Sequence, residues 1–306
     1  MSEGSSVADM VGSMRSDSDF SERLETDRPR RPTGISLFRS RELPALHNPQ
    51  PARNTTPEIY TPPIAPPHRP EKAWESLSPI TLDAAHLAGN GLFLQTAQHE
   101  VTAQFDILRT RLLQAMQERG WHRIAVTSPT HGCGKSLVAG NLALSLARLP
   151  SARTVLMDLE LRHPDLARMM GVASNPLREV LTGEQPLESH LRRAGGNLAL
   201  ALNAEPVGDA AETLLAPQTA DTLRALTRLL EPSVIVLDLP PALGSDDVIS
   251  VLPHVDAVLL VADATRTTAA DIRACERLFE GRTTLMGVIM NRAQERSLRR
   301  YRYGKK

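Results

Sequence analysis

The sequence predicts an α/β fold with a mostly parallel sheet flanked by helices on both faces. Strand and helix signals alternate from about residue 98 onward, as is typical of such folds. The segments 233–238 and 257–262 are unbroken apolar runs, as expected of strands covered on both sides. A glycine-rich turn joins the first strand to a helix, and ligands of such folds bind at the carboxyl ends of strands.

The individual elements follow from local patterns. An apolar stripe with helical spacing predicts a first helix that ends before Gly120, and its residues are Val101, Phe105, Leu108, Leu112 and Met116. Strands are predicted at residues 123–127, 154–158, 197–202, 233–238, 257–262 and 284–290. Helices are predicted at residues 98–118, 136–149, 219–230 and 268–279.

Composition limits the classes of function. The chain has 306 residues, and its 35 basic side chains balance 35 acidic ones, so no overall field favours nucleic acid or anionic lipid. The two cysteines, Cys133 and Cys275, form no disulfide framework and suit a reducing cytosol. Because no signal segment and no long apolar run is found, we expect a cytoplasmic chain without a membrane span.

Three regions are expected along the chain. Residues 1–73 are predicted to be a disordered, proline-rich segment, because 11 of the 23 prolines precede residue 72 and large apolar residues are few. A docking arm for a partner is the alternative. Residues 74–292 are predicted to form the α/β domain, and residues 293–306 a basic tail that contains Tyr301 and Tyr303.

The segment Ser128–Ser136 follows the first strand, and its last part, Gly132–Ser136, matches the end of the P-loop pattern, although Pro129 stands at the usual first glycine. Glycines at positive φ let backbone N–H groups converge on phosphate oxygens, and the following helix adds a partial positive charge. Lys135 would reach the β- and γ-phosphates, and the Ser136 hydroxyl would bind Mg²⁺. We therefore predict a P-loop NTPase fold that binds Mg-ATP. The loop residues predicted to contact the nucleotide are Thr130, His131, Gly132, Cys133, Gly134, Lys135, Ser136 and Leu137.

Acidic residues end two of the predicted strands. Asp238 closes the strand 233–238, a position that holds the hydration shell of Mg²⁺, although a simple turn cap is the alternative. Asp158 closes the strand 154–158 and precedes Glu160 and Arg162, for which solvated loop charges are the alternative.

Together, these motifs resemble those of the bacterial tyrosine kinases, the cytoplasmic ATPases of capsule and exopolysaccharide export. The segment Asp158–Pro164 is similar to the family motif Asp-x-Asp-x-Arg-x-Pro, with Glu160 at the second acidic position. Asp238–Pro241 is similar to the family's Asp-x-Pro-Pro. Asn291 and Arg292 resemble the end of a strand whose asparagine contacts adenine, so the resemblance implies that both residues bind the nucleotide. The resemblance covers about residues 74–292.

The resemblance implies transfer of the γ-phosphate of ATP to tyrosines of the tail, Tyr301 and Tyr303. It implies that Asp158 accepts the tyrosine proton and that Arg162 orients the acidic motif or a neighbouring subunit. The residues with an implied catalytic role are Lys135, Asp158, Glu160 and Arg162. The residues implied to hold the metal are Ser136, Asp158 and Asp238.

The resemblance also implies partners. A membrane chain-length regulator, or polysaccharide co-polymerase, would recruit the chain to the inner membrane, and the chain would form a homo-oligomer. The family's interface helix carries Glu-x-x-Arg-x-x-Arg, whereas the matching positions are Ala103, Asp106 and Arg109. No nucleic acid is expected as a partner.

Other functions stay open. A partitioning-type ATPase switch would share the fold, but Thr130 stands where its signature lysine would be. A non-catalytic nucleotide-binding subunit of an export complex would explain Glu160 and the altered interface helix. The tail could instead be solvated, or could contact an anionic membrane surface. Cys133 is either a redox-sensitive thiol or a tolerated small loop residue, and Cys275 is expected in the core.

Overall fold

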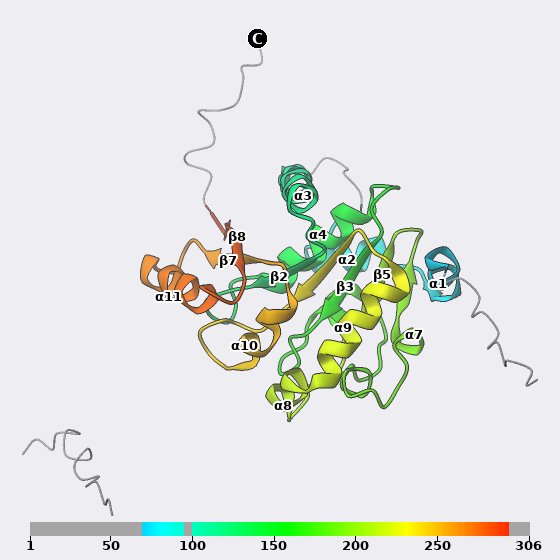
Figure 1. Ribbon diagram of the computed structural model, residues 1–306. Helices are drawn as coiled ribbons and strands as arrows, with labels where there is room; N and C mark the ends of the chain where they lie inside the picture. The colour runs from blue at the N-terminus through cyan, green and yellow to red at the C-terminus, as the bar shows by residue number, and fades with distance from the viewer. Residues whose placement is uncertain (1–68, 95–99, 294–306) are drawn as a thin grey trace, which may run out of the picture. The chain divides into compact units, whose positions relative to one another are not determined.

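The computed structural model describes residues 69–94 and 100–293, and these form one eight-stranded sheet between helices (Figure 1). The strands lie in the order β1-β4-β5-β3-β6-β2-β7-β8, and the pairs are parallel except β4 with β5. The strands are β1 Ser78–Ile80, β2 Arg123–Thr127, β3 Thr154–Asp158, β4 Arg192–Ala194, β5 Leu198–Ala201, β6 Val234–Asp238, β7 Ala257–Asp263 and β8 Thr284–Asn291. The predicted fold class is confirmed.

Helices cover both faces of this sheet. Side chains of α2 to α5 pack on one face, and those of α1 and α6 to α11 pack on the other. The helices are α1 Pro70–Ser76, α2 Ala84–Gly89, α3 Glu100–Arg119, α4 Lys135–Ala147, α5 Leu166–Met170, α6 Arg178–Leu181, α7 Leu187–His190, α8 Ala210–Leu215, α9 Pro217–Leu230, α10 Asp247–Val251 and α11 Ala269–Phe279, with a 3₁₀ turn at Leu252–His254.

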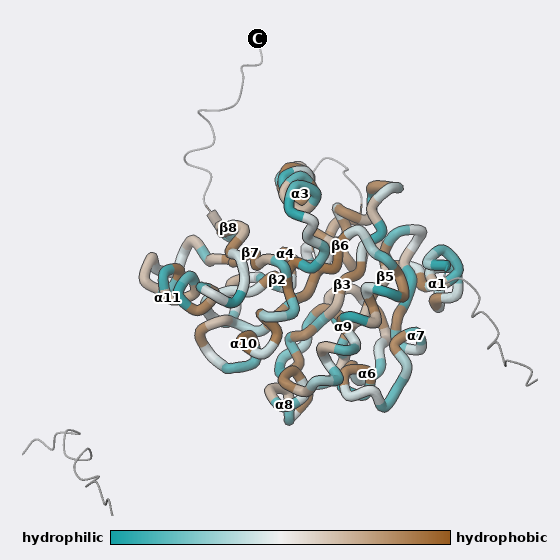
Figure 2. The backbone as a smooth tube through the Cα atoms, viewed as in Figure 1, coloured by the Kyte–Doolittle hydropathy of each residue, from teal (hydrophilic) through white to brown (hydrophobic). Residues whose placement is uncertain are grey.

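The strands divide their side chains between two cores. In β2, Ile124 and Val126 pack on the α3–α4 face, whereas Ala125 packs on the opposite face with residues of α9 and α11. Each fully buried aliphatic side chain contributes roughly 1.5–3 kcal/mol, so this two-sided burial fixes the central strands firmly. Figure 2 shows the apolar strands inside the molecule and polar stretches on the outer helices.

Local signals explain two of the outer helices. Helix α9 begins with a proline in its first turn and buries the side chains predicted to share one face, which are Leu223, Leu226 and Leu230. Helix α11 begins with a capping box, in which Thr268 and Asp271 satisfy each other's backbone N–H groups. It buries Cys275, as predicted.

Some expectations about the outer elements were wrong or incomplete. Leu112 and Met116 of α3 are buried, but Val101 is 48% exposed, so the predicted stripe is buried only at its carboxyl-terminal end. Strands β1 and β4 were missed because three residues are too few to show a period. The expected domain boundary at residue 74 falls inside α1, where Trp74 is buried and its Nε1 donates to the Leu230 carbonyl at 2.8 Å.

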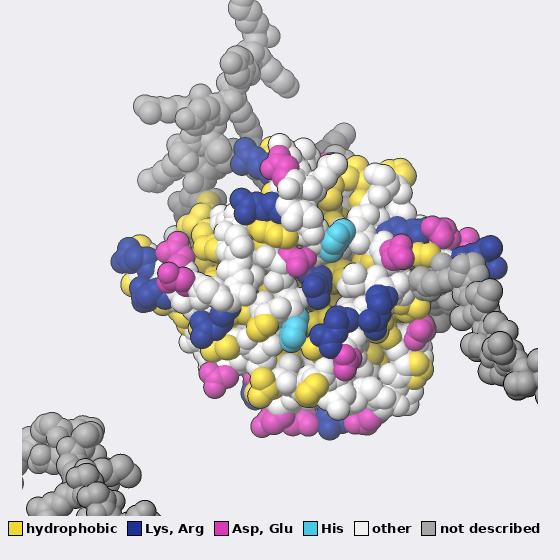
Figure 3. All heavy atoms as spheres, in the orientation of Figure 1, with side chains coloured by type: hydrophobic (Ala, Val, Ile, Leu, Met, Phe, Trp, Pro, Cys, Tyr) yellow, Lys and Arg dark blue, Asp and Glu magenta, His cyan; other side chains and the backbone are white. Residues whose placement is uncertain are grey.

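The surface and the termini bear on the remaining expectations. Basic and acidic side chains occur together on the face in Figure 3, in line with the equal numbers of the two charges. Across the described ranges, no helix combines the length and apolar character needed to cross a bilayer. Residues 1–68 and 294–306 lie outside the described part of the chain, together with the predicted disorder and the tail tyrosines.

Candidate functional site

Two aspartates meet at the carboxyl edge of the sheet. Asp158 ends β3, Asp238 ends β6, and these neighbouring parallel strands pair the two residues directly in register. Strand β2 lies on the other side of β6, so the loop that follows β2 begins at the same edge. Both aspartates are fully buried. The fold therefore places three sequence-predicted features side by side.

The loop between β2 and α4 has the backbone conformation of an anion-binding turn. Gly132 and Gly134 have φ values of 76° and 90°, in the left-handed region where glycine is least strained. The Ser128 hydroxyl donates to the Thr130 carbonyl at 2.8 Å and closes the turn around Pro129. Helix α4 begins directly after Gly134, so its amino terminus adds partial positive charge to the loop.

Lys135 lies among carboxylates. Its Nζ is 3.0 Å from Glu160 Oε2 and 3.7 Å from Asp238 Oδ1, and it donates to the Ser136 hydroxyl at 3.3 Å. Burial disfavours the ammonium charge, but attraction to Asp238 and Glu160 outweighs burial and raises the pKa of Lys135. The site therefore keeps a charged amine at the start of α4, where a P-loop lysine meets phosphate.

The aspartate pair carries more negative charge than Lys135 can balance. Burial raises the pKa of Asp158 well above its usual range, and the charge of Asp238 adds to this effect. Burial also raises the pKa of Asp238, although Lys135 and the Ser136 hydroxyl partly oppose it. Asp158 Oδ2 is buried and has no hydrogen-bond partner within the described ranges. Since such an atom costs about 1–3 kcal/mol, it marks a place that a bound group would complete.

The available oxygen atoms fit a magnesium ion that is bound together with a nucleotide. Mg²⁺ takes oxygen ligands, keeps several waters and usually relies on one or two protein carboxylates plus phosphates. Ser136, Asp158 and Asp238 offer such oxygens, and the two carboxylates share a single nearby ammonium. No cluster of three or more His, Cys, Asp or Glu side chains able to hold a metal occurs in the described part of the chain. A metal here would therefore depend on phosphate ligands.

Glu160, at the second acidic position of the motif, is built into the site. Its Oε2 contacts Lys135, and its Oε1 accepts from the backbone N–H of His163 at 3.3 Å. The backbone N–H of Glu160 in turn donates to Asp158 Oδ1 at 3.1 Å. The longer side chain of glutamate thus reaches Lys135, while the backbone of Glu160 keeps its hydrogen bond to Asp158 in the turn after β3.

Arg162 makes a two-pronged ion pair with Asp247, the first residue of α10. Its Nε lies 2.7 Å from Asp247 Oδ2 and its Nη2 lies 3.0 Å from Oδ1. The hydrogen bonds to this buried carboxylate raise the pKa of Arg162. The contact ties the acidic motif to α10 within one chain, and the role of Arg162 toward a second subunit stays a prediction.

The end of β8 lies beside the phosphate loop. Asn291 Nδ2 donates to the Cys133 carbonyl at 2.8 Å, and Arg292 pairs with Asp263, which ends β7. Arg266, in the turn after β7, donates to the Gly132 carbonyl at 3.0 Å. The adenine contact expected for Asn291 stays a prediction.

The remaining loop residues differ in exposure. His131 is exposed, and its ring lies edge-to-face against His163 with 5.5 Å between the ring centroids. Burial disfavours a thiolate at Cys133, but hydrogen bonds with Thr130 outweigh it and lower the pKa of Cys133. The side chain of Leu137 packs against the core of the α3–α4 face, so a nucleotide contact there would have to come from its backbone.

Sequence reasoning missed Asp263 and Arg266. The predicted strand stopped at Ala262, one residue before the end of β7. Asp158 and Asp238 were selected because each is an acid at the end of an apolar strand. The same rule would have found Asp263 if the predicted strand had been extended by one residue. Arg266 carries no such signal, because its contact with the loop depends on the turn after β7.

The predicted interface helix is bound within the chain. Asp106 of α3 accepts from the Ser145 hydroxyl of α4 at 2.8 Å and pairs with Arg148. Arg109 donates to the Ser145 carbonyl at 3.0 Å. These side chains join α3 to α4, and the homo-oligomer stays a prediction.

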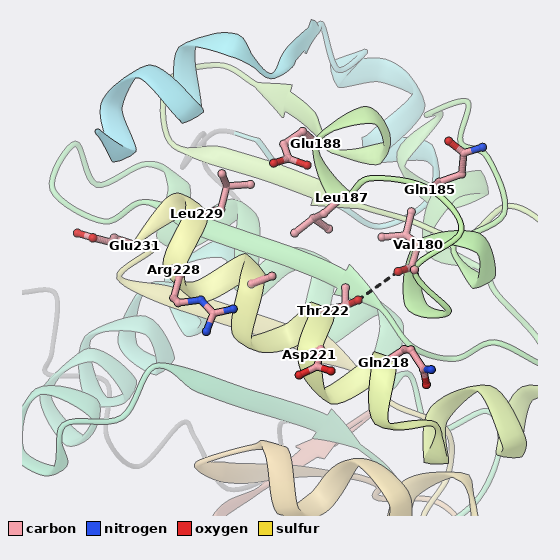
Figure 4. A pocket seen from close by; sticks show the side chains of 12 residues that line it. Val180, Gln185, Leu187, Glu188, Gln218, Asp221, Thr222, Arg228, Leu229 and Glu231 are labelled. Carbon is pink, nitrogen blue, oxygen red and sulfur yellow. Dashed lines mark hydrogen bonds between the residues drawn. The ribbon is translucent and has the colours of Figure 1, made fainter. Parts of the chain in front are cut away.

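A separate surface groove lies against α9 (Figure 4). It has a volume of about 830 Å³ and is lined by apolar side chains of Val180, Leu187 and Leu229 together with charged Asp221. Thr222 Oγ1 donates to the Val180 carbonyl across it at 3.1 Å. No residue of the phosphate loop or of the acidic motif lines this groove, so it is distinct from the candidate site.

Comparisons with known proteins agree with this geometry. A family model described as ParA, the NUBPL iron-transfer P-loop NTPase, matches residues 120–297. EpsB of Ralstonia nicotianae, named as a candidate tyrosine-protein kinase, is 31% identical over 204 residues, which are 64% of this chain and 26% of EpsB. The chain thus spans about a quarter of that relative.

Two further relatives are closer in length to the described domain. The tyrosine-protein kinase YwqD of Bacillus subtilis is 25% identical over 191 residues, which are 61% of this chain and 79% of YwqD. The crystal structure of the VpsO kinase domain has 31% identity and a TM-score of 0.57, and the match covers 64% of this chain and 96% of that domain.

Proposed function

The chain belongs to the ParA family of P-loop NTPases, and we propose that within this fold it is an ATP-dependent protein-tyrosine autokinase. The observation that carries the proposal is the buried set of Lys135, Asp158 and Asp238 beside the phosphate loop. The likeness to EpsB, to YwqD and to the VpsO kinase domain supports the kinase class over other activities of the fold.

In the proposed reaction, the N–H groups of the loop and Lys135 bind the β- and γ-phosphates of ATP. Ser136 and Asp238 would hold Mg²⁺, which when bound neutralises charge on the phosphates. Asp158 accepts the proton of the tyrosine hydroxyl as its oxygen attacks the γ-phosphorus, and the bond to the bridging oxygen of ADP breaks. The raised pKa of Asp158 brings this carboxylate closer to the range in which a general base works well.

The phosphoacceptors in this proposal are Tyr301 and Tyr303. We place the chain on the cytoplasmic side of the inner membrane, bound to a membrane chain-length regulator and assembled with further copies of itself. Phosphorylation of the basic tail would change its charge and so its contacts, which is how it would regulate polysaccharide polymerisation and export.

Iron transfer, which the family description names, is not carried over to this chain. Iron–sulfur clusters are generally held by four thiolates. This chain has two cysteines, and Cys133 and Cys275 are buried in the cores on opposite faces of the sheet. A single chain therefore supplies too few thiolates for one such cluster.

An ATPase switch of the partitioning type is the alternative function for a P-loop NTPase of this fold. It would hydrolyse ATP at the same loop without transferring phosphate to tyrosine. A non-catalytic subunit would bind nucleotide and do neither. Tyrosine phosphate separates the kinase from both alternatives, and ATP turnover separates the alternatives from each other.

The proposal is tested by incubating the purified chain with Mg-ATP and mapping phosphotyrosine by mass spectrometry. We expect phosphate on Tyr301 or Tyr303 that is absent from Lys135→Ala and from the double variant Tyr301→Phe/Tyr303→Phe. Tyr60→Phe is the matched control, because Tyr60 is the third tyrosine of the chain and should not be needed. ATP binding or hydrolysis without any phosphotyrosine would overturn the kinase and leave the switch or the assembly subunit.

A further inference from the structure

Two consecutive carbonyl groups of the phosphate loop are bound from outside by side chains of later strands and turns. Arg266 Nη2 donates to the carbonyl of Gly132 at 3.0 Å, and Asn291 Nδ2 donates to the carbonyl of Cys133 at 2.8 Å. The approach leaves no room for larger residues: a Cβ on Gly134 would collide with Asn291 Nδ2. These side chains therefore contact the backbone of the loop directly.

The geometry of the peptide bond means that these contacts also fix the direction of the loop's N–H groups. In a planar trans peptide, the C=O and N–H bonds point in opposite directions. Because the carbonyls of Gly132 and Cys133 point outward to side-chain donors, the N–H groups of Cys133 and Gly134 point to the other side. Neither N–H group donates a hydrogen bond to any part of the chain that the structure describes. Such unpartnered, neighbouring N–H groups are the ones that bind phosphate oxygens.

Asp263 holds the donors in place. It ends β7 and is fully buried, and its carboxylate accepts from Arg266 Nε at 3.0 Å and pairs with Arg292. It also accepts from the backbone N–H of Thr265 at 2.9 Å and from its hydroxyl at 2.6 Å. Arg292 follows Asn291 directly, and its backbone N–H donates to the Asn291 amide oxygen at 2.9 Å. That bond orients the amide so that its NH₂ group faces the loop.

We propose that Asp263, Arg266 and Asn291 are positioning residues that clamp the phosphate loop with its free N–H groups directed at the bound phosphates. The proposal rests on the nucleotide site of the proposed function, but it requires no phosphoryl transfer. The clamp sets the loop before the ligand arrives, and a preformed loop loses less freedom on binding. Because the clamp acts on backbone carbonyls, it governs affinity for phosphates, and this effect is separate from the adenine contact predicted for Asn291.

The first test replaces the amide of Asn291. Asn291→Asp keeps the size but removes the donor and places a carboxylate against the Cys133 carbonyl. We expect affinity for Mg-ADP to fall about tenfold or more, because a hydrogen bond is lost and a repulsion is added. Isothermal titration calorimetry with Mg-ADP and with inorganic tripolyphosphate measures this. Since tripolyphosphate has no base, the clamp predicts that its affinity falls along with that of Mg-ADP.

The matched control is Asn197→Asp. Asn197 Nδ2 also donates to a backbone carbonyl, that of Leu149 at 3.2 Å, but it lies outside the phosphate loop. Its replacement should leave both affinities unchanged. If Asn291→Asp weakens Mg-ADP but not tripolyphosphate, Asn291 acts on the adenine and the clamp is overturned.

The second test separates hydrogen bonding from charge at Arg266. Arg266→Leu has no donor, whereas Arg266→Gln keeps an N–H donor without the positive charge. We expect Leu to weaken tripolyphosphate binding about three- to tenfold and Gln to recover most of this loss. Arg224→Leu is the control, because Arg224 forms an equivalent i, i+3 pair with Asp221 on α9. Equal losses for Leu and Gln would show simple charge attraction and contradict the clamp.

Thermal melting of each variant identifies any that do not fold. If another variant fails to fold, binding by the conservative Arg266→Gln variant still tests the clamp. A wild-type chain that binds neither ligand would contradict both the clamp and the proposed function. Wild-type binding with unchanged variants would overturn the clamp alone. If the wild type binds both ligands and the Asn291 and Arg266 variants weaken binding as expected, but no phosphotyrosine forms, only the autokinase would be overturned.

Discussion

The Asp158–Asp238 pair and Asp263 lie at the same edge of one sheet, each at the end of an apolar strand, yet their surroundings are opposite. Asp158 Oδ2 has no partner within the described ranges, and burial raises the pKa of both members of the pair. Asp263 is surrounded by donors, and hydrogen bonds from Thr265 lead those that lower its pKa. A carboxylate with unbalanced charge can bind a cation or accept a proton, whereas a satisfied one can only hold structure.

The largest expected effect comes from removing Lys135, the cation beside the Asp158–Asp238 pair. Lys135→Ala leaves Asp158, Glu160 and Asp238 buried without the ammonium that lies among them. We expect the free energy of unfolding to fall by about 3–5 kcal/mol, as for other broken buried ion pairs. Phosphoryl transfer should fall at least about 100-fold, because a preorganised charge at the phosphates is lost. Chemical denaturation and initial rates measure the two effects.

Lys135→Arg is the companion variant for this test. It keeps the positive charge and should retain most of the stability while still impairing transfer, since its geometry differs. A Lys135→Ala chain as stable as wild type would show that the carboxylates are protonated in the folded state.

The second change neutralises one member of the pair. Asp158→Asn removes a buried charge, so we expect the free energy of unfolding at neutral pH to rise by about 1–3 kcal/mol. Transfer to tyrosine should nevertheless be lost, because the amide cannot accept the proton. A variant that is more stable than the wild type but inactive would identify Asp158 as a functional residue.

The pH dependence of stability checks the same residue. The folded pKa of Asp158 is raised above the ordinary value of 3.8, so the folded chain binds this proton more tightly than the unfolded chain does. Its contribution to stability is therefore present at low pH and is lost as pH rises from about 3.8 through the raised value. Asp158→Asn should flatten this slope, and an unchanged slope would assign the pH dependence to other groups.

A smaller and opposite pH effect is expected at Asp263. Its folded pKa is lowered, so its contribution is present above the ordinary value of 3.8 and is lost as pH falls below it. Asp263→Asn should lower the melting temperature at pH 7, and the difference from wild type should shrink as pH falls below 3.8. Melting curves across this range measure it. A difference that grows in acid would contradict the satisfied carboxylate.

The smallest effect is expected for the thiol in the loop. Cys133 is buried and contacts the hydroxyls of Thr130 and Thr267 through its sulfur at 3.6 and 3.9 Å. Cys133→Ala removes these weak contacts and should change Mg-ADP affinity less than about threefold. Because the sulfur is shielded, peroxide should leave ATP turnover of the wild type unchanged. Inactivation by peroxide that the alanine variant resists would instead establish a redox role.

Parts of the site followed from local sequence. Asp158 and Asp238 were predicted because each ends an apolar run, and parallel strands carry such residues to one edge. Gly132, Gly134 and Lys135 were predicted because a phosphate loop needs left-handed glycines directly before a helix. The short strands β1 and β4 and the exposure of Val101 were not predictable in this way. Whether these strands form and whether Val101 is exposed depend on which other elements pack against them, and sequence periodicity does not specify those elements.

The sequence by itself determined the alternation of strands and helices, the phosphate loop and the acids at two strand ends, because each depends on residues close together in the chain. Tertiary structure decided what binds the loop from outside. Arg266 reaches Gly132 across 134 residues of sequence, and Asn291 reaches Cys133 across 158. It also decided that Asp263 is satisfied while Asp158 is not. The physical reason is that a carboxylate's charge balance is the sum over donors from several elements, and only folding brings those elements together.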